Sequence, residues 1–429
     1  MDGLLTSYAA SLDYLFARTT GTFKFGLERT RALLAELGDP QSRYPILHIA
    51  GTNGKGSAVA TAEALLRARG LRVARYTSPH LVDFRERMIV DGVPIEADAI
   101  VDYVNERTPL VEKIGASFFE ATTALAFLHF ARVGCDVALV EAGLGGRLDS
   151  TNVVVPRAAG VTSIGYDHME YLGPTLYDIA GEKAGIFKPG VPAVIGEPDE
   201  ELGAFLAERA RAAGASPVHV APSELKIADV NVLPEGTRFT LSALDEKRTV
   251  QTPLVGRHQA WNFAFTLALL GAAGDPFRVS LSEAVESVKH VRLPGRFQRQ
   301  GKYLFDVAHN ADGVRALVGS LRAVAATRPV VAVLCVLTDK DWRGMMDALS
   351  EVVDSFILTD APTAPASRAW SLDDARAFAR ARGYTARAEH DFDTALAVAA
   401  AEGETVLVTG SFHTVGDAMS RLAVSSLTG

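Results

Sequence analysis

The chain has 429 residues, of which 48% are hydrophobic and 22% charged, and its formal net charge is −8. These values are typical of a globular protein with two or three domains, and the acidic balance argues against a nucleic-acid-binding surface. No apolar run reaches the roughly 18 residues of a membrane span, and the first residues do not have the pattern of a signal peptide. Cys135 and Cys335 each lie in an apolar run, as buried thiols in a reducing cytoplasm do. We therefore expect a soluble, cytoplasmic protein.

Helical patterns in residues 1–38 are predicted to pack beside a first strand at residues 46–50. This strand runs into a glycine-rich loop, Gly-Thr-Asn-Gly-Lys-Gly-Ser at residues 51–57, and then into a helix at residues 58–69. Glycines let the backbone turn sharply and bring its amide groups close to an anion. The whole context predicts a loop that binds the phosphates of a nucleotide.

Within that loop, Lys55 would reach the β- and γ-phosphates, and Ser57 would offer its hydroxyl to a magnesium ion. The spacing departs from the usual phosphate loop in two places. Gly56 separates the lysine from the serine, and Ile49 stands where the first glycine would fall. A plain turn between strand and helix is the alternative interpretation.

The second predicted strand, residues 71–77, ends at a loop that contains Ser78 and His80. Loops at the carboxyl ends of parallel strands are where α/β proteins bind ligands, so both residues are candidates by position. His80 could equally be a loop histidine without a ligand. Arg87, a little further on, is most simply a solvated side chain.

A strongly apolar helix at residues 116–131 contains one acid, Glu120, which is either exposed at the helix start or directed at a ligand. The next buried strand, residues 136–140, leads directly into Glu141. A carboxylate at the end of a strand in a phosphate-loop protein commonly binds the magnesium ion of the nucleotide. Glu141 is therefore the strongest metal candidate, and Arg147 and Asp149 lie at the rim of the glycine-rich loop that follows it.

His168 follows a predicted strand at residues 161–164, where an imidazole could bind a second divalent ion or a phosphate. Lys183 lies in a predicted helix at residues 176–187 among small residues. It is either a surface lysine with a buried stem, a buried base or a modified ligand. Asn262, in an apolar helix at residues 256–270, needs a hydrogen-bonding partner such as a neighbouring backbone group or an adenine.

The helical pattern breaks at Leu293, and we place a domain boundary between residues 291 and 292. The remainder alternates strands with helices, which predicts a second, smaller doubly wound sheet without a phosphate loop. Its strands are predicted at residues 303–307, 330–336, 355–358 and 405–409, and its helices at 311–325, 342–352 and 372–382. Asp306 and His309 follow the first of these strands and Ser411 follows the last. The fold class is thus α/β, with an N-terminal phosphate-loop ATPase domain built on a mostly parallel sheet and a smaller Rossmann-like C-terminal domain.

Eight motifs occur in a characteristic order: AGTNGKGS, YTSPHL, SFFEATTALAF, VEAGLGGRLDSTN, DHMEYLG, EKAGIFKPG, LPGRFQ and DVAHN. In this order they resemble the motifs of folylpolyglutamate synthases and dihydrofolate synthases, which belong to the Mur ligase superfamily. The resemblance spans about residues 20–420. Where that family commonly has glycine in the last motif, this chain has Val307, which leaves the aspartate and the histidine of the motif intact.

The resemblance implies an ATP-dependent ligase that joins L-glutamate to dihydropteroate or a reduced folate through an acyl phosphate. It implies a catalytic role for Lys55, Lys183 and His309. It implies ATP contacts for Gly51, Thr52, Asn53, Gly54, Lys55, Gly56, Ser57, Asn262, Arg296 and Asp306. Two magnesium ions would be held by Ser57, Ser78, Glu141, His168 and a carbamylated Lys183. L-Glutamate would contact Arg87, His309 and Ser411, and the pterin side would be lined by Phe118, Phe119, Glu120, Arg147 and Asp149.

Two alternatives stay open. One is a Mur-type ligase that acts on a peptidoglycan precursor, and the other is a binding module that ATP switches without any ligation. We expect a monomer with small-molecule substrates and with neither a nucleic-acid nor a membrane partner.

Overall fold

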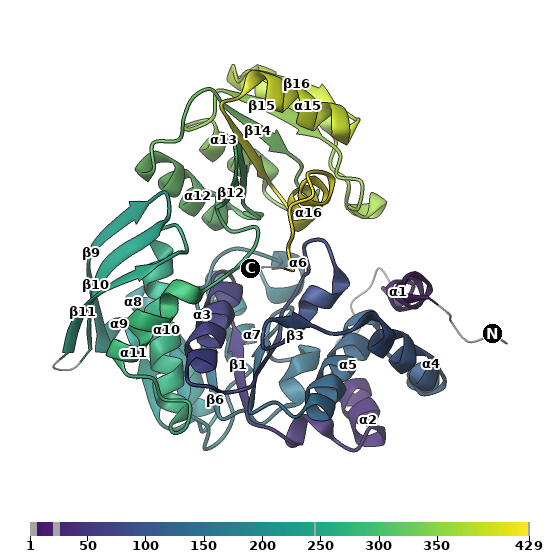
Figure 1. The fold of residues 1–429 in the computed structure, drawn as a ribbon, viewed down its shortest axis with the longest axis vertical. Helices are drawn as coiled ribbons and strands as arrows, with labels where there is room; N and C mark the ends of the chain where they lie inside the picture. The colour runs from purple at the N-terminus through teal and green to yellow at the C-terminus, as the bar shows by residue number, and fades with distance from the viewer. Residues whose placement is uncertain (1–6, 20–25, 244–245, 428–429) are drawn as a thin grey trace.

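The computed structural model describes residues 7–19, 26–243 and 246–427. Two α/β parts lie one above the other, with a small antiparallel sheet at one side (Figure 1). The lower part is built on an eight-stranded sheet and the upper part on a six-stranded sheet. Among the described residues, no helix is both long enough and apolar enough to span a membrane.

The large sheet has the strand order β4-β3-β2-β5-β1-β6-β7-β8. Its strands are β1 Ile46–Ala50, β2 Val73–Tyr76, β3 Met88–Val90, β4 Val93–Pro94, β5 Val137–Glu141, β6 Ala158–Val161, β7 Ala193–Ile195 and β8 Val218–Val220. All neighbours pair in parallel except β3 and β4, which form an antiparallel edge. Every residue of β1 and β5 is buried, as expected for central parallel strands covered on both faces.

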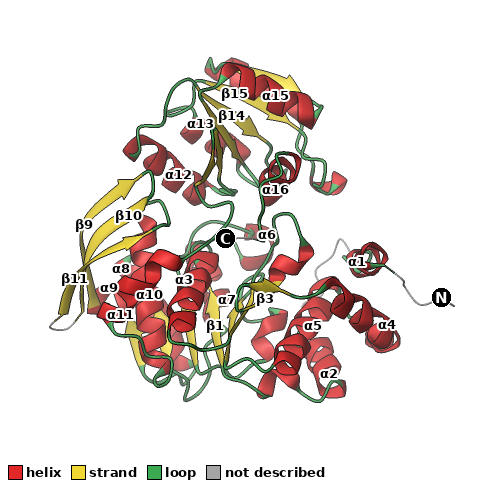
Figure 2. Cartoon of the chain, viewed as in Figure 1, coloured by secondary structure: helices red, strands yellow, loops and turns green. Residues whose placement is uncertain are grey.

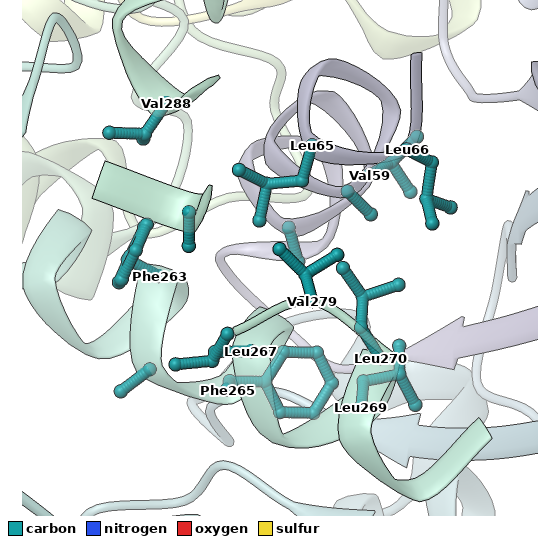
Figure 3. Packing of buried hydrophobic residues seen from close by; sticks show 14 of the residues in the cluster. Val59, Leu65, Leu66, Phe263, Phe265, Leu267, Leu269, Leu270, Val279 and Val288 are labelled. Atoms are coloured by element: carbon teal, nitrogen blue, oxygen red, sulfur yellow. The ribbon is translucent and has the colours of Figure 1, made fainter. Parts of the chain in front are cut away.

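Helices cover both faces of this sheet, because successive strand residues point to opposite sides. Leu47 and Ile49 belong to a core shared with α3 (Lys55–Ala68) and α10 (His258–Ala273). Figure 3 shows side chains of the two helices in this core, among them Leu65 and Phe265. The opposite face is covered by α5 Phe118–Val133, α7 Leu176–Ala184 and α8 Glu200–Ala212 (Figure 2). Three further helices belong to the core beside α5: α1 Tyr8–Phe16, α2 Glu28–Glu36 and α4 Ala97–Ile114. We expected the first two to pack beside β1, but they pack mainly on α4 and α5.

Residues 221–252 form a separate unit at the side of the molecule (Figure 1). A short helix, α9 (Ala221–Glu224), precedes an antiparallel sheet in the order β11-β10-β9. Its strands are β9 Leu225–Leu233, β10 Gly236–Ala243 and β11 Glu246–Thr252. The sheet packs on α10 through the edge-to-face rings of Phe239 and Phe263, whose centroids are 5.6 Å apart.

The upper sheet has the order β12-β13-β17-β14-β15-β16, and only β12 is antiparallel to its neighbour. Its strands are β12 Gln298–Gln300, β13 Tyr303–Phe305, β14 Val330–Leu334, β15 Ser355–Thr359, β16 Ala386–Glu389 and β17 Thr405–Thr409. Its helices are α12 Ala311–Ala323, α13 Trp342–Leu349, α14 Leu372–Arg382, α15 Phe392–Glu402 and α16 Phe412–Arg421. After α10 the chain forms α11 (Leu281–Ser287) and a short 3-10 turn at Val288–His290 before it enters β12.

One predicted strand in the large sheet was misplaced. Residues 161–164 were predicted as extended, but β6 ends at Val161. The next two residues turn toward the phosphate loop: the Thr162 hydroxyl donates to the carbonyl of Asn53 at 2.7 Å, and the Ser163 carbonyl accepts the amide of Thr52 at 2.7 Å. Local hydrophobicity could not show this turn, because its bonds reach a loop that is about 110 residues away in the chain.

Candidate active site

The phosphate loop requires glycine at two of its positions. Gly51 and Gly54 have φ values of 147° and 91°, which side-chain-bearing residues rarely adopt. A Cβ atom on Gly51 would lie 1.8 Å from the hydroxyl of Thr162. The loop leads into α3 at Lys55, and Ser57 is buried in the first turn of that helix. Free amide groups and the helix dipole at such a position favour an anion.

Two lysines meet at one backbone carbonyl in this loop. The ammonium of Lys55 donates to Gly51 O at 3.0 Å, and that of Lys183 donates to the same oxygen at 2.9 Å. Lys183 lies on α7 and is buried. Burial, together with the charge of Lys55, lowers the pKa of Lys183 to about 7. The predicted metal ligand Lys183 therefore lies beside the predicted phosphate-binding Lys55.

Glu141, the last residue of β5, lies on the other side of Lys55. One of its oxygens is 3.8 Å from the Lys55 ammonium, and the backbone of Ser78 is near enough to its carboxyl to lower the pKa of Glu141. Burial raises the pKa of Glu141, whereas the charges of Lys55 and Arg296 oppose that shift. Glu141, Ser78 and Lys55, which follow three different strands, thus lie close together, and their roles as ligands stay predictions.

Arg296 lies in the segment that precedes the upper sheet, and its charge interacts with that of Glu141. Its guanidinium lies 5.4 Å from the ring centroid of Phe412. Burial lowers the pKa of Arg296, and the charges of Asp306 and Glu141 act in the opposite direction. Asp306 accepts the amides of Phe297 and Ala308, each at 2.9 Å. Asp306 therefore holds the segment that presents Arg296.

Asn262 lies on α10 directly above the phosphate loop. Its amide nitrogen donates to the side chain of Gln259 at 2.9 Å. Its carbonyl oxygen would be 2.4 Å from a Cβ atom on Gly54. The close approach of α10 to the loop therefore depends on the absence of a side chain at Gly54.

His168 begins a short helix, α6 (Met169–Leu172), with a left-handed φ of 52°. The residue before it, Asp167, was not among the sequence candidates. Its buried carboxylate accepts from Lys340 at 2.5 Å and from Asn310 at 3.2 Å, and it lies 3.5 Å from His309 Nε2. Burial opposes ionisation of Asp167, but the hydrogen bond from His309 and the charges of His168, His309 and Lys340 hold its pKa far below the usual range. Its place in the motif DHMEYLG was the only signal that could have identified it.

The residues predicted to bind glutamate fall into different surroundings. Arg87 was expected to be solvated, but it is buried. Its guanidinium donates to His80 Nδ1 at 2.9 Å and lies 5.3 Å from the ring centroid of Phe118. Burial and the charge of Arg87 lower the pKa of His80 to about 3, so this ring is neutral. His309 donates through Nδ1 to the carbonyl of Val307 at 2.8 Å.

Ser411, the third predicted glutamate contact, is the N-cap of α16. Its hydroxyl oxygen accepts the amide of Thr414 at 3.0 Å, and its side chain is buried. Capping of this kind is a common structural role for serine. The contact with glutamate stays a prediction.

Two of the five predicted pterin contacts are aromatic. Phe118 stacks on Phe16 with ring centroids 5.2 Å apart. Phe119 packs so closely on Gly143 that a Cβ atom there would be 2.4 Å from its ring. The glycine-rich loop after β5 thus lies against the start of α5.

The charged members of the predicted pterin set have structural partners. Glu120 accepts the amide of Ser117 at 2.8 Å and a bond from Arg29 at 3.1 Å. Asp149 is buried and accepts the amides of Leu144 and Thr151 at 2.8 and 3.0 Å. Arg147 is largely exposed and pairs with Glu182 at 2.9 Å. These contacts explain why the three residues suit their positions, and their pterin contacts stay predictions.

The donor set suits a hard divalent cation, which prefers oxygen and accepts imidazole. A buried carboxylate, Glu141, lies beside Ser78 and near the start of α3, where Ser57 is buried. The part of the chain that the structure describes contains no group of three or more His, Cys, Asp or Glu side chains arranged around a metal ion. The predicted set instead combines one carboxylate and one imidazole with hydroxyls and a lysine.

Comparison with known proteins decides the family. The Mur ligase middle domain matches residues 49–270, and the Mur ligase glutamate ligase domain matches residues 295–412. The dihydrofolate synthase/folylpolyglutamate synthase of Bacillus subtilis is 33% identical, covering 98% of this chain and 100% of its own length. The chain belongs to this family.

Solved members of the dihydrofolate synthase/folylpolyglutamate synthase family share the fold. Escherichia coli FolC in complex with DHPP and ADP is 33% identical, with a TM-score of 0.88 over 99% of both chains. A bifunctional folylpolyglutamate synthase/dihydrofolate synthase with Mn, AMPPNP and L-glutamate bound has a TM-score of 0.84 over 98% of this chain and 99% of its own. The expected family and fold class are therefore confirmed.

Proposed function

We propose that this chain is an ATP-dependent ligase that adds L-glutamate to dihydropteroate, to a reduced folate or to both. The proposal rests above all on the 3.8 Å approach of Lys55, in the phosphate loop, to Glu141, at the end of β5. Arg296 of the C-terminal part is near enough for its charge to lower the pKa of Glu141. A nucleotide held there would have its phosphates between two cations, beside a carboxylate suited to a metal ion. Family members named for this reaction cover nearly the whole chain.

The chemistry requires activation of the pterin-containing substrate, because a free carboxylate is a poor electrophile. Transfer of the γ-phosphoryl group to that carboxylate gives an acyl phosphate, and the glutamate amine then displaces phosphate to form the amide. Lys55 and the amides at the start of α3 would stabilise the negative charge that develops on the transferred group. Glu141, Ser78, Ser57 and His168 would hold a divalent ion, which supplies further charge neutralisation when bound.

The two substrates would contact different sets of side chains. Phe118 and Phe119 offer aromatic surface to the flat pterin ring. Arg87, whose guanidinium lies 5.3 Å from the ring centroid of Phe118, would contact a carboxylate of L-glutamate. His309 and Ser411 belong to the C-terminal part and would contact L-glutamate. This division of roles rests on the family resemblance and on the placement of these side chains.

A carbamylated Lys183 and a second divalent ion are part of the proposal. Two ammonium groups share the carbonyl of Gly51, and their like charges repel each other in a buried place. Addition of carbon dioxide to the neutral Lys183 amine, with loss of one proton, gives a carbamate. This would replace a cation with an anion that can bind a metal ion. We also propose that the protein is a cytoplasmic monomer.

The test uses the pure protein with ATP, magnesium and L-glutamate, with dihydropteroate and tetrahydrofolate supplied separately and the products identified by mass. We expect a gain of one glutamyl unit on at least one substrate, and no gain when glutamate is omitted. If phosphate is released from ATP at the same rate with and without the pterin substrate and glutamate, the result would instead favour an ATP-switched binding module. Ligation of an amino acid to a peptidoglycan precursor would favour the Mur-type alternative.

A further inference from the structure

Asp167 is a single carboxylate of the large part at which several groups of the C-terminal part converge. It lies in the loop between β6 and α6. Lys340, from the loop between β14 and α13, donates to its Oδ1 at 2.5 Å. Asn310, the N-cap of α12, donates to its Oδ2 at 3.2 Å. Side chains from two separate loops of the C-terminal part therefore donate hydrogen bonds to the same carboxylate of the large part.

Both charges of this contact are removed from water. The side chains of Asp167 and Lys340 are each only 7% exposed. Charges taken out of water are tolerated only with a close, well-oriented partner, and removal of one partner leaves an uncompensated buried charge. A buried ion pair also accepts far fewer geometries than an apolar contact. The pair therefore selects one relative placement of the two parts.

The same carboxylate is directly connected to the candidate active site. The backbone amide of His168, the predicted metal ligand, donates to Asp167 Oδ1 at 2.9 Å. Asn310 also donates to the side chain of Asn53 in the phosphate loop at 3.2 Å. A shift of the C-terminal part would thus act on His168 and on the phosphate loop at once.

We infer that Asp167, Lys340 and Asn310 form an inter-domain clasp, which holds the two parts in the arrangement needed for phosphoryl transfer. Asp167 and Lys340 are positioning residues, since they act through His168 and the phosphate loop. The kinetic consequences rest on the proposed ligase function. The effect on domain arrangement does not depend on it.

The first test is a double-mutant cycle with Lys340→Met, Asp167→Asn and the combined variant. We expect each single variant to lower kcat by about 10- to 100-fold, because small displacements of the reacting groups reduce the reaction rate by factors of this size. The combined variant should be no slower than the slower single variant, because the two residues act as one contact. Lys340→Arg, which keeps the cation, should retain most of the activity. Lys289→Met is the matched control, since it removes a lysine from an exposed pair with Glu286.

The second test measures domain arrangement without any ligation. Spin labels are attached through Glu208→Cys on α8 and Arg376→Cys on α14, two exposed positions in the two parts, while the native cysteines are buried. With magnesium and AMPPNP present, the parent should give one narrow distance distribution. Lys340→Met and Asp167→Asn should broaden it, and Lys289→Met should not. Should a single variant fail to fold, the combined variant carries this test, because it leaves no charge buried.

An unchanged distance distribution in the combined and single variants would overturn the clasp. So would single-variant losses in kcat that multiply in the combined variant. A Lys340→Met effect confined to the KM for glutamate would also overturn it, since that pattern indicates direct substrate contact. If the parent does not ligate glutamate but its distances respond as expected, only the proposed function fails.

Discussion

Among single residues, Lys183 is the one for which we expect the largest effect of substitution on turnover. Lys183→Ala should lower turnover by about 10³ or more, roughly 4 kcal/mol of transition-state stabilisation, while ATP still binds. The reason is the loss of the anionic ligand that a carbamate would provide beside Lys55. Turnover is measured by amide formation and ATP binding by calorimetry.

Short-chain carboxylic acids offer a direct check on this role of Lys183, because they could occupy the place of the carbamate. Recovery of turnover in the Lys183→Ala variant with such acids would support it. Near-normal turnover in that variant without additives would exclude an essential role. Lys289→Ala, a change at an exposed lysine, should leave turnover unaltered.

Gly51 and Gly56 belong to the same phosphate-binding motif but should respond differently to alanine. Gly51→Ala should lower the free energy of unfolding by about 2 kcal/mol, because φ is 147° and a Cβ would overlap the Thr162 hydroxyl. Gly56→Ala should raise it by about 0.5–1 kcal/mol, because Gly56 is within α3 and a Cβ there meets open space. Urea denaturation of both variants is the measurement. Equal effects would contradict the geometry described for the loop.

At the scale of secondary-structure elements, the carboxylate of Glu120 stabilises the start of the helix α5. Glu120 closes a capping box with Ser117 and pairs with Arg29 on α2. Glu120→Ala should therefore lower the free energy of unfolding by about 2 kcal/mol. Glu283→Ala removes the same capping-box position from the exposed start of α11, and a smaller loss of about 0.5 kcal/mol is expected.

Kinetics with the same variant separate the two roles of Glu120. If the residue only supports α5 and α2, the KM for the pterin substrate should change little at temperatures where the variant is folded. A rise of KM by about tenfold or more, without loss of stability, would return Glu120 to the pterin site predicted from the sequence.

Strand and helix types followed largely from sequence periodicity, whereas several boundaries and edge elements did not. β14 was predicted at residues 330–336 and ends at Leu334, because the apolar run continues into a buried loop. β16 was not predicted at all, since its sequence Ala-Arg-Ala-Glu has no apolar signal and it lies at the sheet edge. Such elements are defined by their neighbours in the sheet.

Stability of the whole molecule should depend on pH through buried histidines. His48, on β1, is fully buried with Nε2 at 2.8 Å from the Thr151 hydroxyl. Burial, with a smaller effect of Lys188, lowers its pKa to about 3. The unfolded chain gains a proton at His48 as pH falls below about 6.5, but the folded chain does not until about pH 3. The contribution of His48 to the free energy of unfolding is therefore complete above about pH 6.5 and decreases as the pH falls toward 3.

Urea denaturation at pH 7 and pH 5 measures this contribution. Relative to His48→Gln, the parent should lose about 2 kcal/mol more of its unfolding free energy between these two pH values. His290→Gln, at an exposed position, is the control and should keep the pH dependence of the parent. An identical pH dependence in His48→Gln would contradict a neutral, buried His48.

Residues close together in the chain carried most of what the sequence revealed. The glycine loop after β1, the acid at the end of β5 and the alternation of strands and helices are local patterns. They act through backbone conformation and hydrophobic periodicity over about ten residues. The family motifs added roles for Lys183 and Arg296 that local patterns left open.

The partners of polar side chains depended on the packing of distant segments. Asp167 meets Lys340 across 173 positions of the chain, and Glu120 meets Arg29 across 91. These contacts exist because two sheets, or two helices, bring separate segments together and exclude water from between them. A buried carboxylate needs a hydrogen-bonding or charged partner, and this need follows from its chemistry alone. Which residue becomes that partner is decided by the three-dimensional packing of the chain.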